Sequence, residues 1–446
     1  MLYSIFVILL ALSCVKSDNL FLRNFGAFTD GENTVYHAIV NGQIFSKLIF
    51  LSKSGDNIIL SKNETIYYIP DKNTPFYHNL TNITFYFHGN VFLHDDIQYW
   101  PQNSDSSYYN AFDIRDSQYI TITGFGTING KGYNWWKDFL FGKIVRQRPT
   151  IIYFKDSINL NINQLTLIDS PRFNIYCDNV VNLEVSFLKI WVNIEQQKEL
   201  TNTTIKLKLP IFPFNTDGVD VKGKHIHIHD IHISNYDDSI CVKPSKSNTP
   251  SINDHQMSCS EDILVENIII YLGAGLSIGS VSSQHKSCIK NVIFKNIIAY
   301  NPLKFIYIKT GGIDDAQQSE GFISNITYSN MTAYNPVLWP VYIGPQQQKE
   351  PDGTGEGVWP DTNPFVTIHD ILIEHINVFN IISKPGIIRC NTTNPCYNIN
   401  FKYVKMIPKN ILNFKESYIC DNNISALGYY DNFTYPPIKN CGLILK

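Results

Sequence analysis

The amino-acid sequence predicts an all-β protein, a right-handed parallel β-helix with an amino-terminal cap. From about residue 121 onward, short runs rich in β-branched residues alternate apolar and polar side chains, as in "INLNINQLTLID", and each run ends at Asn, Asp, Gly or Ser. The runs recur at a spacing of roughly twenty to forty residues, which is typical of solenoid folds. No sustained helical periodicity separates them.

Many of the repeats consist of a strand, a break and a second strand. The break is Asp230 in "KHIHIHDIHISN" and Asn267 in "DILVENIIIYL". Such doublets suit coils stacked about 4.8 Å apart, whose inward Ile, Val and Leu side chains form one continuous core. A β-sandwich would instead need hairpin turns, and Asn-Gly pairs are scarce: the two clear cases are Asn41-Gly42 and Asn129-Gly130.

The segment before the repeats predicts a cap. Residues 24–45 combine turn residues with a short helical pattern, which could cover the open end of a solenoid. We find no linker rich in Pro, Gly or Ser, so the sequence predicts a single β-helix domain over residues 18–446.

The first residues predict export. Residues 1–17 resemble a signal peptide, because the apolar stretch 5–12 is too short to span a bilayer and small residues follow it. No other stretch reaches about 18 consecutive apolar residues, and the net charge of −3 comes without a long basic run. We therefore expect a secreted, extracellular monomer that binds neither membrane nor nucleic acid.

The cysteines support the same compartment. Removal of the signal peptide leaves eight cysteines without a C-x-x-C pair, which favours disulfides over a zinc site. The sequence leaves their connectivity open, and nearest-neighbour pairing gives Cys241–Cys259, Cys390–Cys396 and Cys420–Cys441. Nine glycosylation sequons fit a glycoprotein: Asn63, Asn79, Asn82, Asn202, Asn325, Asn330, Asn391, Asn423 and Asn432.

Three aspartates are the candidate catalytic residues. Asp217 stands in an Asn-Thr-Asp-Gly turn, and Asp237 and Asp238 follow about one coil later, so we expect all three on one outer face. Carboxylates this close cannot all ionise without cost, and at least one pKa should rise. Glycoside hydrolysis uses such carboxylates as acid and base. Taken singly, each aspartate is better explained by an Asx turn, and it is their spacing together that favours catalysis.

The motifs around these aspartates resemble those of the polygalacturonase (pectinase) family of glycoside hydrolases. The ordered matches, which run through most of the mature chain, are "NFGAFTDG" (24–31), "GTINGKGYNWW" (126–136), "RPTIIYF" (148–154), "DSPRFNI" (169–175), "NTDGVDV" (215–221), "DDSICVKP" (237–244), "GLSIGSV" (275–281) and "IKT" (308–310).

The resemblance implies inverting hydrolysis of pectin, an acidic plant polysaccharide, without a cofactor or metal. Asp237 would be the general acid, and Asp217 and Asp238 would hold and deprotonate the water. Lys309 would pair with a galacturonate carboxylate, and Asn215 would bind substrate.

Two positions depart from the family pattern. Ala274 stands where the family has a histidine, and Tyr307 replaces an arginine. Tyr307 offers a face for sugar stacking and one hydroxyl in place of a charge, which suggests a less acidic sugar at one subsite. A rhamnogalacturonan-type hydrolase is therefore an alternative, although such relatives tend to have Asp-Glu where this chain has Asp237-Asp238. A non-catalytic pectin-binding β-helix protein is another.

Three further signals have two interpretations each. His225, His227 and His229 share one strand face and either bind a metal or form a solvent-facing ladder, which we favour. The aspartates could ligate Ca²⁺ in a pectate lyase, but the hydrolase motifs favour cleavage by water. The pair Trp135-Trp136 could edge a groove or pack in the core.

Overall fold

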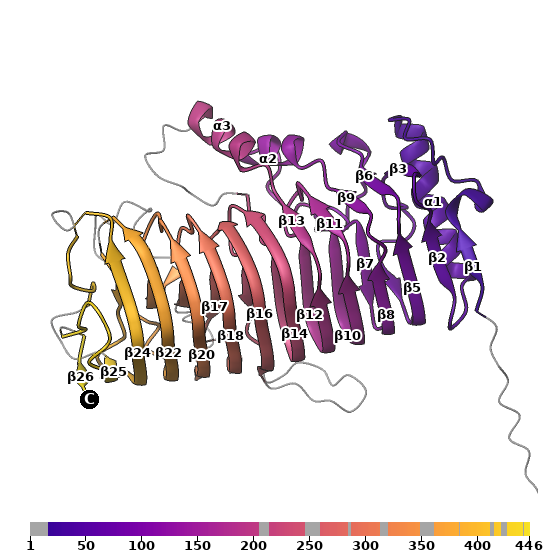
Figure 1. Ribbon diagram of the computed structural model, residues 1–446. Coiled ribbons are helices and arrows are strands. Elements are labelled where there is room, and N and C mark those ends of the chain that lie inside the picture. Colours follow the sequence, from indigo (N-terminus) through magenta and orange to yellow (C-terminus); the bar gives the residue numbers. More distant parts are fainter. Residues whose placement is uncertain are drawn as a thin grey trace, which may run out of the picture.

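The computed structural model describes residues 17–204, 214–245, 259–283, 287–312, 320–347, 361–382, 384–410, 414–420, 426–439 and 441–446. In this part of the chain the strands pair in parallel and stack coil upon coil, as Figure 1 shows. Parallel crossover connections are almost always right-handed. The predicted right-handed parallel β-helix is confirmed.

Three columns of strands form three faces of the helix. The first face contains β4 (Tyr77–His78), β7 (Phe112–Arg115), β15 (Ile240–Val242), β17 (Leu276–Val281), β19 (Ile306–Thr310), β21 (Val341–Gln346) and β23 (Gly386–Ile388). The second face begins with β1 (Asn19–Phe21), β2 (Asn57–Leu60), β5 (Thr81–Phe87) and β8 (Gln118–Thr123). The third begins with β3 (Thr65–Tyr68), β6 (Asn90–Leu93), β9 (Thr127–Asn129), β11 (Thr166–Ile168) and β13 (Lys189–Trp191).

Long bent strands connect these faces. They are β10 (Ile152–Asn163), β12 (Ile175–Ser186), β14 (Val219–Asn235), β16 (Ser260–Leu272), β18 (Cys288–Tyr300), β20 (Gly321–Tyr334), β22 (Val366–Ile381) and β24 (Cys396–Pro408), and β25 (Ala426–Tyr430) and β26 (Leu443–Leu445) follow. The strand β14 takes part in all three faces, because its start pairs with β15, its middle with β12 and β16, and its end with β13.

The predicted breaks are bends in the left-handed conformation. Asp230 and Asn267 have φ values of 53° and 57°, which short polar side chains tolerate better than most. The Nδ2 of Asn267 donates to Oδ1 of Asp230 across adjacent coils, at 3.3 Å. These residues therefore bend each strand and link it to its neighbour. In contrast, Asn41-Gly42 lies inside a helix and not in a hairpin.

The core is a stack of aliphatic side chains. Val185, Ile228 and Val265 lie at matching positions of β12, β14 and β16 and are fully buried. The same alternation continues along the coils, and a continuous apolar cluster extends from Leu22 to Leu443. Each Å² of apolar surface that is buried contributes about 25 cal/mol to stability. The column of inward side chains is therefore the main source of stability.

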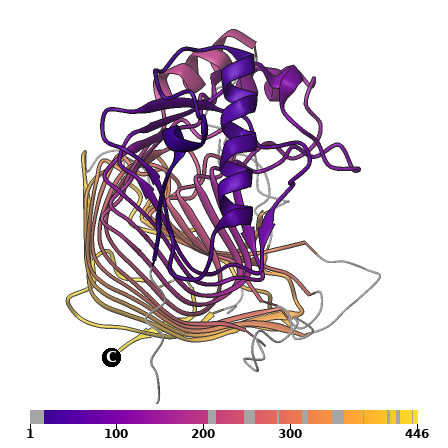
Figure 2. The same cartoon turned by 90° about the vertical axis from the view of Figure 1, so that its right-hand side faces the viewer.

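A helix covers the amino-terminal end, as Figure 2 shows. The cap is α1 (Val35–Leu51), longer than the short helix that the sequence predicts, and Thr34 is its N-cap, accepting a hydrogen bond from the backbone N–H of His37 at 3.1 Å. The ring of Phe45 packs on Phe85 and Phe112 of the first coils. The other helical segments are η1 (Leu22–Phe25), η2 (Ile97–Tyr99), α2 (Tyr133–Leu140) and α3 (Ile194–Thr204).

Three disulfides join described residues. Cys390–Cys396 and Cys420–Cys441 confirm the nearest-neighbour pairing. The pairing Cys241–Cys259 is wrong, because Cys259 bonds to Cys288. Both of these cysteines lie at the starts of adjacent long strands, whereas Cys241 is buried on the first face and its Sγ contacts the carbonyl of Gly279. Spacing in sequence could not reveal which coil supplies the partner.

Among the described residues no helix combines the length and apolar character needed to cross a membrane. The expected signal peptide lies, apart from Ser17, outside the described residues.

Candidate active site

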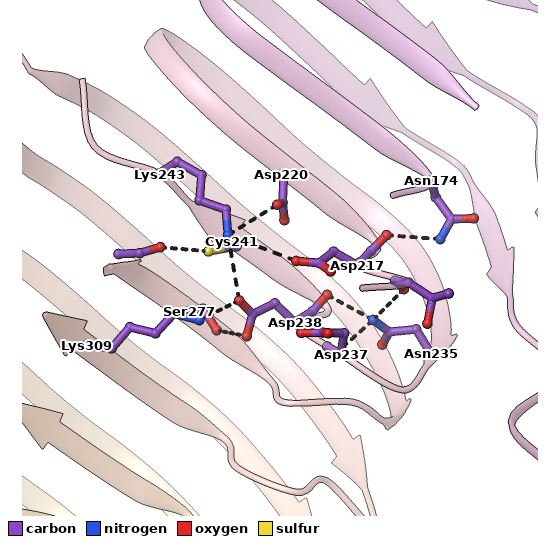
Figure 3. A network of polar contacts seen from close by, with 12 residues as sticks. Asn174, Asp217, Asp220, Asn235, Asp237, Asp238, Cys241, Lys243, Ser277 and Lys309 are labelled. Atoms are coloured by element: carbon purple, nitrogen blue, oxygen red, sulfur yellow. Dashed lines mark hydrogen bonds and ion pairs between the residues drawn. The ribbon is translucent and has the colours of Figure 1, made fainter. Parts of the chain in front are cut away.

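The three predicted aspartates lie together, as Figure 3 shows. One carboxylate oxygen of each of Asp217, Asp237 and Asp238 lies within 4.8 Å of the others. Asp217 and Asp238 are buried, whereas Asp237 is partly exposed. A ligand can therefore reach this carboxylate cluster at Asp237.

Two adjacent turns bring the carboxylates together. Asp217 precedes β14, while Asp237 and Asp238 lie in the turn between β14 and β15 and not within a strand. The backbone N–H of Gly218 donates to the carbonyl of Asp238 at 2.9 Å. A Cβ at Gly218 would lie 2.3 Å from the carbonyl oxygen of Ser239, so only glycine permits this approach.

The side chain of Asn235, at the end of β14, holds both turns. Its Nδ2 donates to the backbone carbonyls of Thr216, Asp237 and Asp238 at 2.9–3.1 Å. Its Oδ1 accepts from the hydroxyl of Ser239 at 3.0 Å. Because this amide is fully buried, its hydrogen bonds fix the distance between the two turns that carry the carboxylates.

Asp238 is the ionised member of the cluster. The Nζ of Lys309 donates to its Oδ2 at 2.8 Å, and the hydroxyl of Ser277 donates to its Oδ1 at 2.6 Å. Burial alone would raise the pKa of Asp238, but the positive charges of Lys309 and Lys243 outweigh it and lower this pKa to about 2. Asp238 is therefore a carboxylate at neutral pH.

The other two aspartates have raised pKa values. Burial, followed by the charge of Asp238, raises the pKa of Asp237 to about 7. Burial and the neighbouring Asp237 raise the pKa of Asp217 well above its usual range. Asp237 can therefore carry a proton near neutral pH, next to an ionised neighbour, which is the division of roles that acid–base chemistry requires.

Lys243 and Asp220 are among the site residues that the sequence interpretation missed. Lys243 lies 3.3 Å from Oδ2 of Asp220, 3.9 Å from Oδ2 of Asp238 and 4.0 Å from Oδ2 of Asp217. Its positive charge therefore stabilises the ionised forms of several carboxylates at once. Asp220 is fully buried, and burial raises its pKa. The period-two pattern of "TDGVDV" and "DDSICVKP" places Asp220 and Lys243 on this outer side, and that signal could have identified them.

Asn215 lies beside the cluster and is held by an arginine. The Nη2 of Arg148 donates to Oδ1 of Asn215 at 3.3 Å, and its Nη1 donates to the carbonyl of Pro171 at 2.9 Å. Burial, then the charge of Arg172, lowers the pKa of Arg148 to about 9. Arg172 is partly exposed and close enough to Asp217 and Asp237 to interact with their charges.

Ala274 and Tyr307, the two residues that depart from the family pattern, lie close together. Ala274 and Tyr307 belong to one buried apolar cluster with Trp339, Tyr342 and Ile387. The ring of Tyr307 is 4% exposed, and the Nζ atoms of Lys304 and Lys309 lie 3.8 Å and 4.4 Å from its centroid. In this arrangement the ring contacts two ammonium groups and leaves little surface for a sugar.

The histidine row pairs with carboxylates. His225 lies 3.4 Å from Asp262, and His227 lies 2.9 Å from Glu266. His229 contacts Asp230 and Glu184, and its ring stacks on that of His227. His225 is exposed and His227 is partly exposed, as the polar ladder predicts. By contrast, Trp135 and Trp136 are fully buried, as core packing predicts.

Comparison with known proteins agrees with this architecture. The family profile of glycosyl hydrolases family 28 matches residues 71–426. A probable endo-xylogalacturonan hydrolase A of Aspergillus niger is 25% identical over 234 residues, which cover 52% of this chain and 50% of that protein. A polygalacturonase of Chamaecyparis obtusa is 28% identical over 173 residues, 37% of this chain and 28% of that protein.

Solved structures show the same fold. The endo-xylogalacturonan hydrolase of Aspergillus tubingensis superposes with a TM-score of 0.62 at 16% identity, covering 96% of this chain and 99% of that one. The hyperthermoactive exopolygalacturonase of Thermotoga maritima gives a TM-score of 0.59 at 16% identity, covering 92% and 93%.

The matched segments span half the length or less of the first curated relatives, from 34% to 50%. The family profile, however, covers most of this chain and includes all three aspartates. The chain therefore belongs to glycosyl hydrolases family 28.

Proposed function

We propose that this protein is a secreted glycosidase that hydrolyses a pectic polysaccharide at the carboxylate cluster. Asp237, partly exposed and with a pKa of about 7, protonates the leaving oxygen. Asp238, ionised beside Lys309, accepts the proton of the attacking water, and Asp217 holds that water. The meeting of three carboxylates, with Lys309 and Ser277 bound to Asp238 and not to Asp237, is the observation that carries the proposal.

The substrate we propose is a galacturonan with acidic backbone sugars. Lys243 and Arg172 are partly exposed beside the cluster and can contact a sugar carboxylate. Lys309 is 2% exposed and its Nζ pairs with Asp238, so its main role in this proposal is to keep Asp238 ionised. A substituted backbone such as xylogalacturonan, for which two relatives are named, belongs among the substrates to be tested.

Inversion of configuration rests on family membership. Inverting enzymes usually separate their two carboxyl groups by about 6.5–9.5 Å, and retaining enzymes by about 5–5.5 Å. The nearest oxygens of this cluster lie within 4.8 Å. Proton NMR of the first-formed product therefore has to establish the stereochemistry: the β-anomer from an α-linked substrate indicates inversion.

The test is release of reducing ends from polygalacturonate, xylogalacturonan and rhamnogalacturonan, with product sizes. The variant Asp237→Asn should lose at least about 100-fold in kcat, since general acid catalysis contributes about 10²–10⁴-fold. The surface variant Asp105→Asn should keep its activity and serves as the matched control.

Other outcomes identify the alternatives. Three carboxylates can also ligate Ca²⁺. Unsaturated, ultraviolet-absorbing products that disappear on chelation would indicate a lyase. If the wild type and Asp237→Asn both bind the polymer and neither releases reducing ends, the protein is a binding protein and the hydrolase proposal is wrong.

A further inference from the structure

A row of aromatic side chains follows the outer surface of the third face. Tyr271, Tyr300, Tyr334 and Phe379 lie at matching positions of β16, β18, β20 and β22. Neighbouring rings are stacked, with centroids 5.3–5.4 Å apart. Each inner ring is therefore covered by its neighbours, and at the β16 end the row stops at Tyr271.

The next position toward the amino terminus is a gap. Ser234 of β14 pairs with Tyr271, and Trp191 of β13 pairs with Ser234, so a small side chain separates two aromatic ones. Trp191 is 47% exposed and Tyr271 is 40% exposed. These three residues line a cleft of about 580 Å³ at the start of α3. We refer to it as the Ser234 cleft.

The spacing across the Ser234 cleft suits one sugar ring. Trp191 and Tyr271 stand two strands apart, or about 9.6 Å at the usual strand separation of about 4.8 Å. A ring that contacts an aromatic face on each side needs about 3.5–4.0 Å to either face. One pyranose therefore fits between the two walls, with Ser234 as the floor.

The rim of the cleft has both hydrogen-bonding groups and balanced charge. Asn193 and Asn301 offer amides, and Lys189 and Glu195 contribute one charge of each sign. The Nζ of Lys189 lies 5.5 Å from the ring of Trp191, and Glu195 pairs with Lys198 at 3.0 Å. The lining itself therefore has one lysine and one glutamate, with no excess of lysine or arginine charge that would select an acidic sugar.

We propose that the Ser234 cleft binds a neutral pyranose unit of a polysaccharide. The cleft contains none of the residues of the carboxylate cluster. It lies on the third face, whereas Asp220, Lys309 and their neighbours lie on the first. This binding does not depend on whether the carboxylate cluster hydrolyses a bond, so either can fail without the other.

The experiment measures binding of β-1,4-galactotetraose and β-1,4-xylotetraose to the full chain by calorimetry, with tetragalacturonate as the acidic comparison. Trp191→Ala removes one wall and should weaken binding of the better neutral ligand about fivefold, because stacking on an aromatic ring contributes about 1 kcal/mol. Ser234→Tyr should fill the gap and also abolish binding. Phe50→Ala, which removes an exposed ring elsewhere, should leave it unchanged.

Thermal unfolding identifies any variant that fails to fold, and Trp191→Ala, at an exposed position, keeps the test valid if Ser234→Tyr does not fold. Absence of neutral-sugar binding to the wild type, undiminished binding to Trp191→Ala, or a preference for tetragalacturonate that Lys189→Ala abolishes would each overturn the proposal.

Discussion

Asp237 and Asp238 are neighbours in the chain, yet their surroundings shift their pKa values in opposite directions. Lys309 and Ser277 contact Asp238 directly, whereas the carboxylate of Asp237 accepts a hydrogen bond from the backbone N–H of Asp238, at 2.8 Å. Together with burial, these contacts give Asp238 a pKa of about 2 and Asp237 a pKa of about 7. The acid and base roles therefore depend on side chains from β17 and β19 as much as on the aspartates.

The pH dependence of kcat/KM should follow these two groups. Asp237 must be protonated, so activity should fall as the pH rises through about 7, and Asp238 must be ionised, so activity should persist to low pH. Lys309→Met removes the charge that lowers the pKa of Asp238 and should move the acid limb to higher pH. The exposed Lys72→Met is the control. An unchanged acid limb in Lys309→Met would remove Asp238 from the role of base.

Restoring the family arginine should not restore a typical polygalacturonase. Tyr307 is 4% exposed and lies between Lys304 and Lys309, so Tyr307→Arg adds a third positive charge to an apolar cluster. We expect a lower midpoint of unfolding and less activity on polygalacturonate, whereas Tyr307→Phe should stay near wild type. Denaturant unfolding and reducing-end assays measure both, and a gain of activity in Tyr307→Arg would contradict this interpretation.

At the scale of elements, the turn between β14 and β15 positions the site. The buried amide of Asn235 satisfies three carbonyls in the two turns that carry the carboxylates. A short turn without such support could not hold neighbouring aspartates in different environments. The geometry thus depends on a residue that does not itself carry charge.

Asn235→Ala should destabilise the protein by about 2–3 kcal/mol and lower kcat more than it raises KM, because buried carbonyls lose their partner and the turns separate. The control is Asn103→Ala, at an exposed turn. Chemical denaturation and steady-state kinetics measure the two effects. A stable, fully active Asn235→Ala would show that the backbone alone fixes the site.

The sequence could predict strands, breaks and the meeting of three aspartates, because period-two patterns and the spacing of one coil have direct geometric meaning. It could not predict that Lys309 would turn toward Asp238, or that Tyr307 would be buried, because both depend on side chains from adjacent coils. The same reason explains the wrong partner assigned to Cys259. These contacts join residues that are far apart in the sequence, and the register between adjacent coils decides which of them meet.

At the scale of the whole molecule, each coil relies on its neighbours. In such a solenoid the stability is roughly a sum of coil and interface contributions. Inward side chains contribute to two interfaces at once, whereas outward ones contact solvent. The inward and outward residues of one strand should therefore respond very differently to truncation.

Ile228→Ala and His227→Ala test this difference within β14. Ile228 is fully buried between Val185 and Val265, and its truncation should cost about 2–5 kcal/mol. The outward His227 loses a partly exposed contact with Glu266, which contributes about 1 kcal/mol or less. Free energies of unfolding from urea titration measure both. Equal losses would disprove the stacked-core account.

The uniform aliphatic interior has a consequence for assembly of the chain. Ile and Val are the commonest side chains of this core, so a coil stacked on the wrong neighbour would still bury apolar side chains. The native order of the coils is distinguished by hydrogen bonds between polar side chains at the bends, such as that from Asn267 to Asp230. The side-chain amides at the bends would thus specify the order in which the coils stack. Their replacement by apolar residues would yield compact, inactive molecules with wrongly stacked coils.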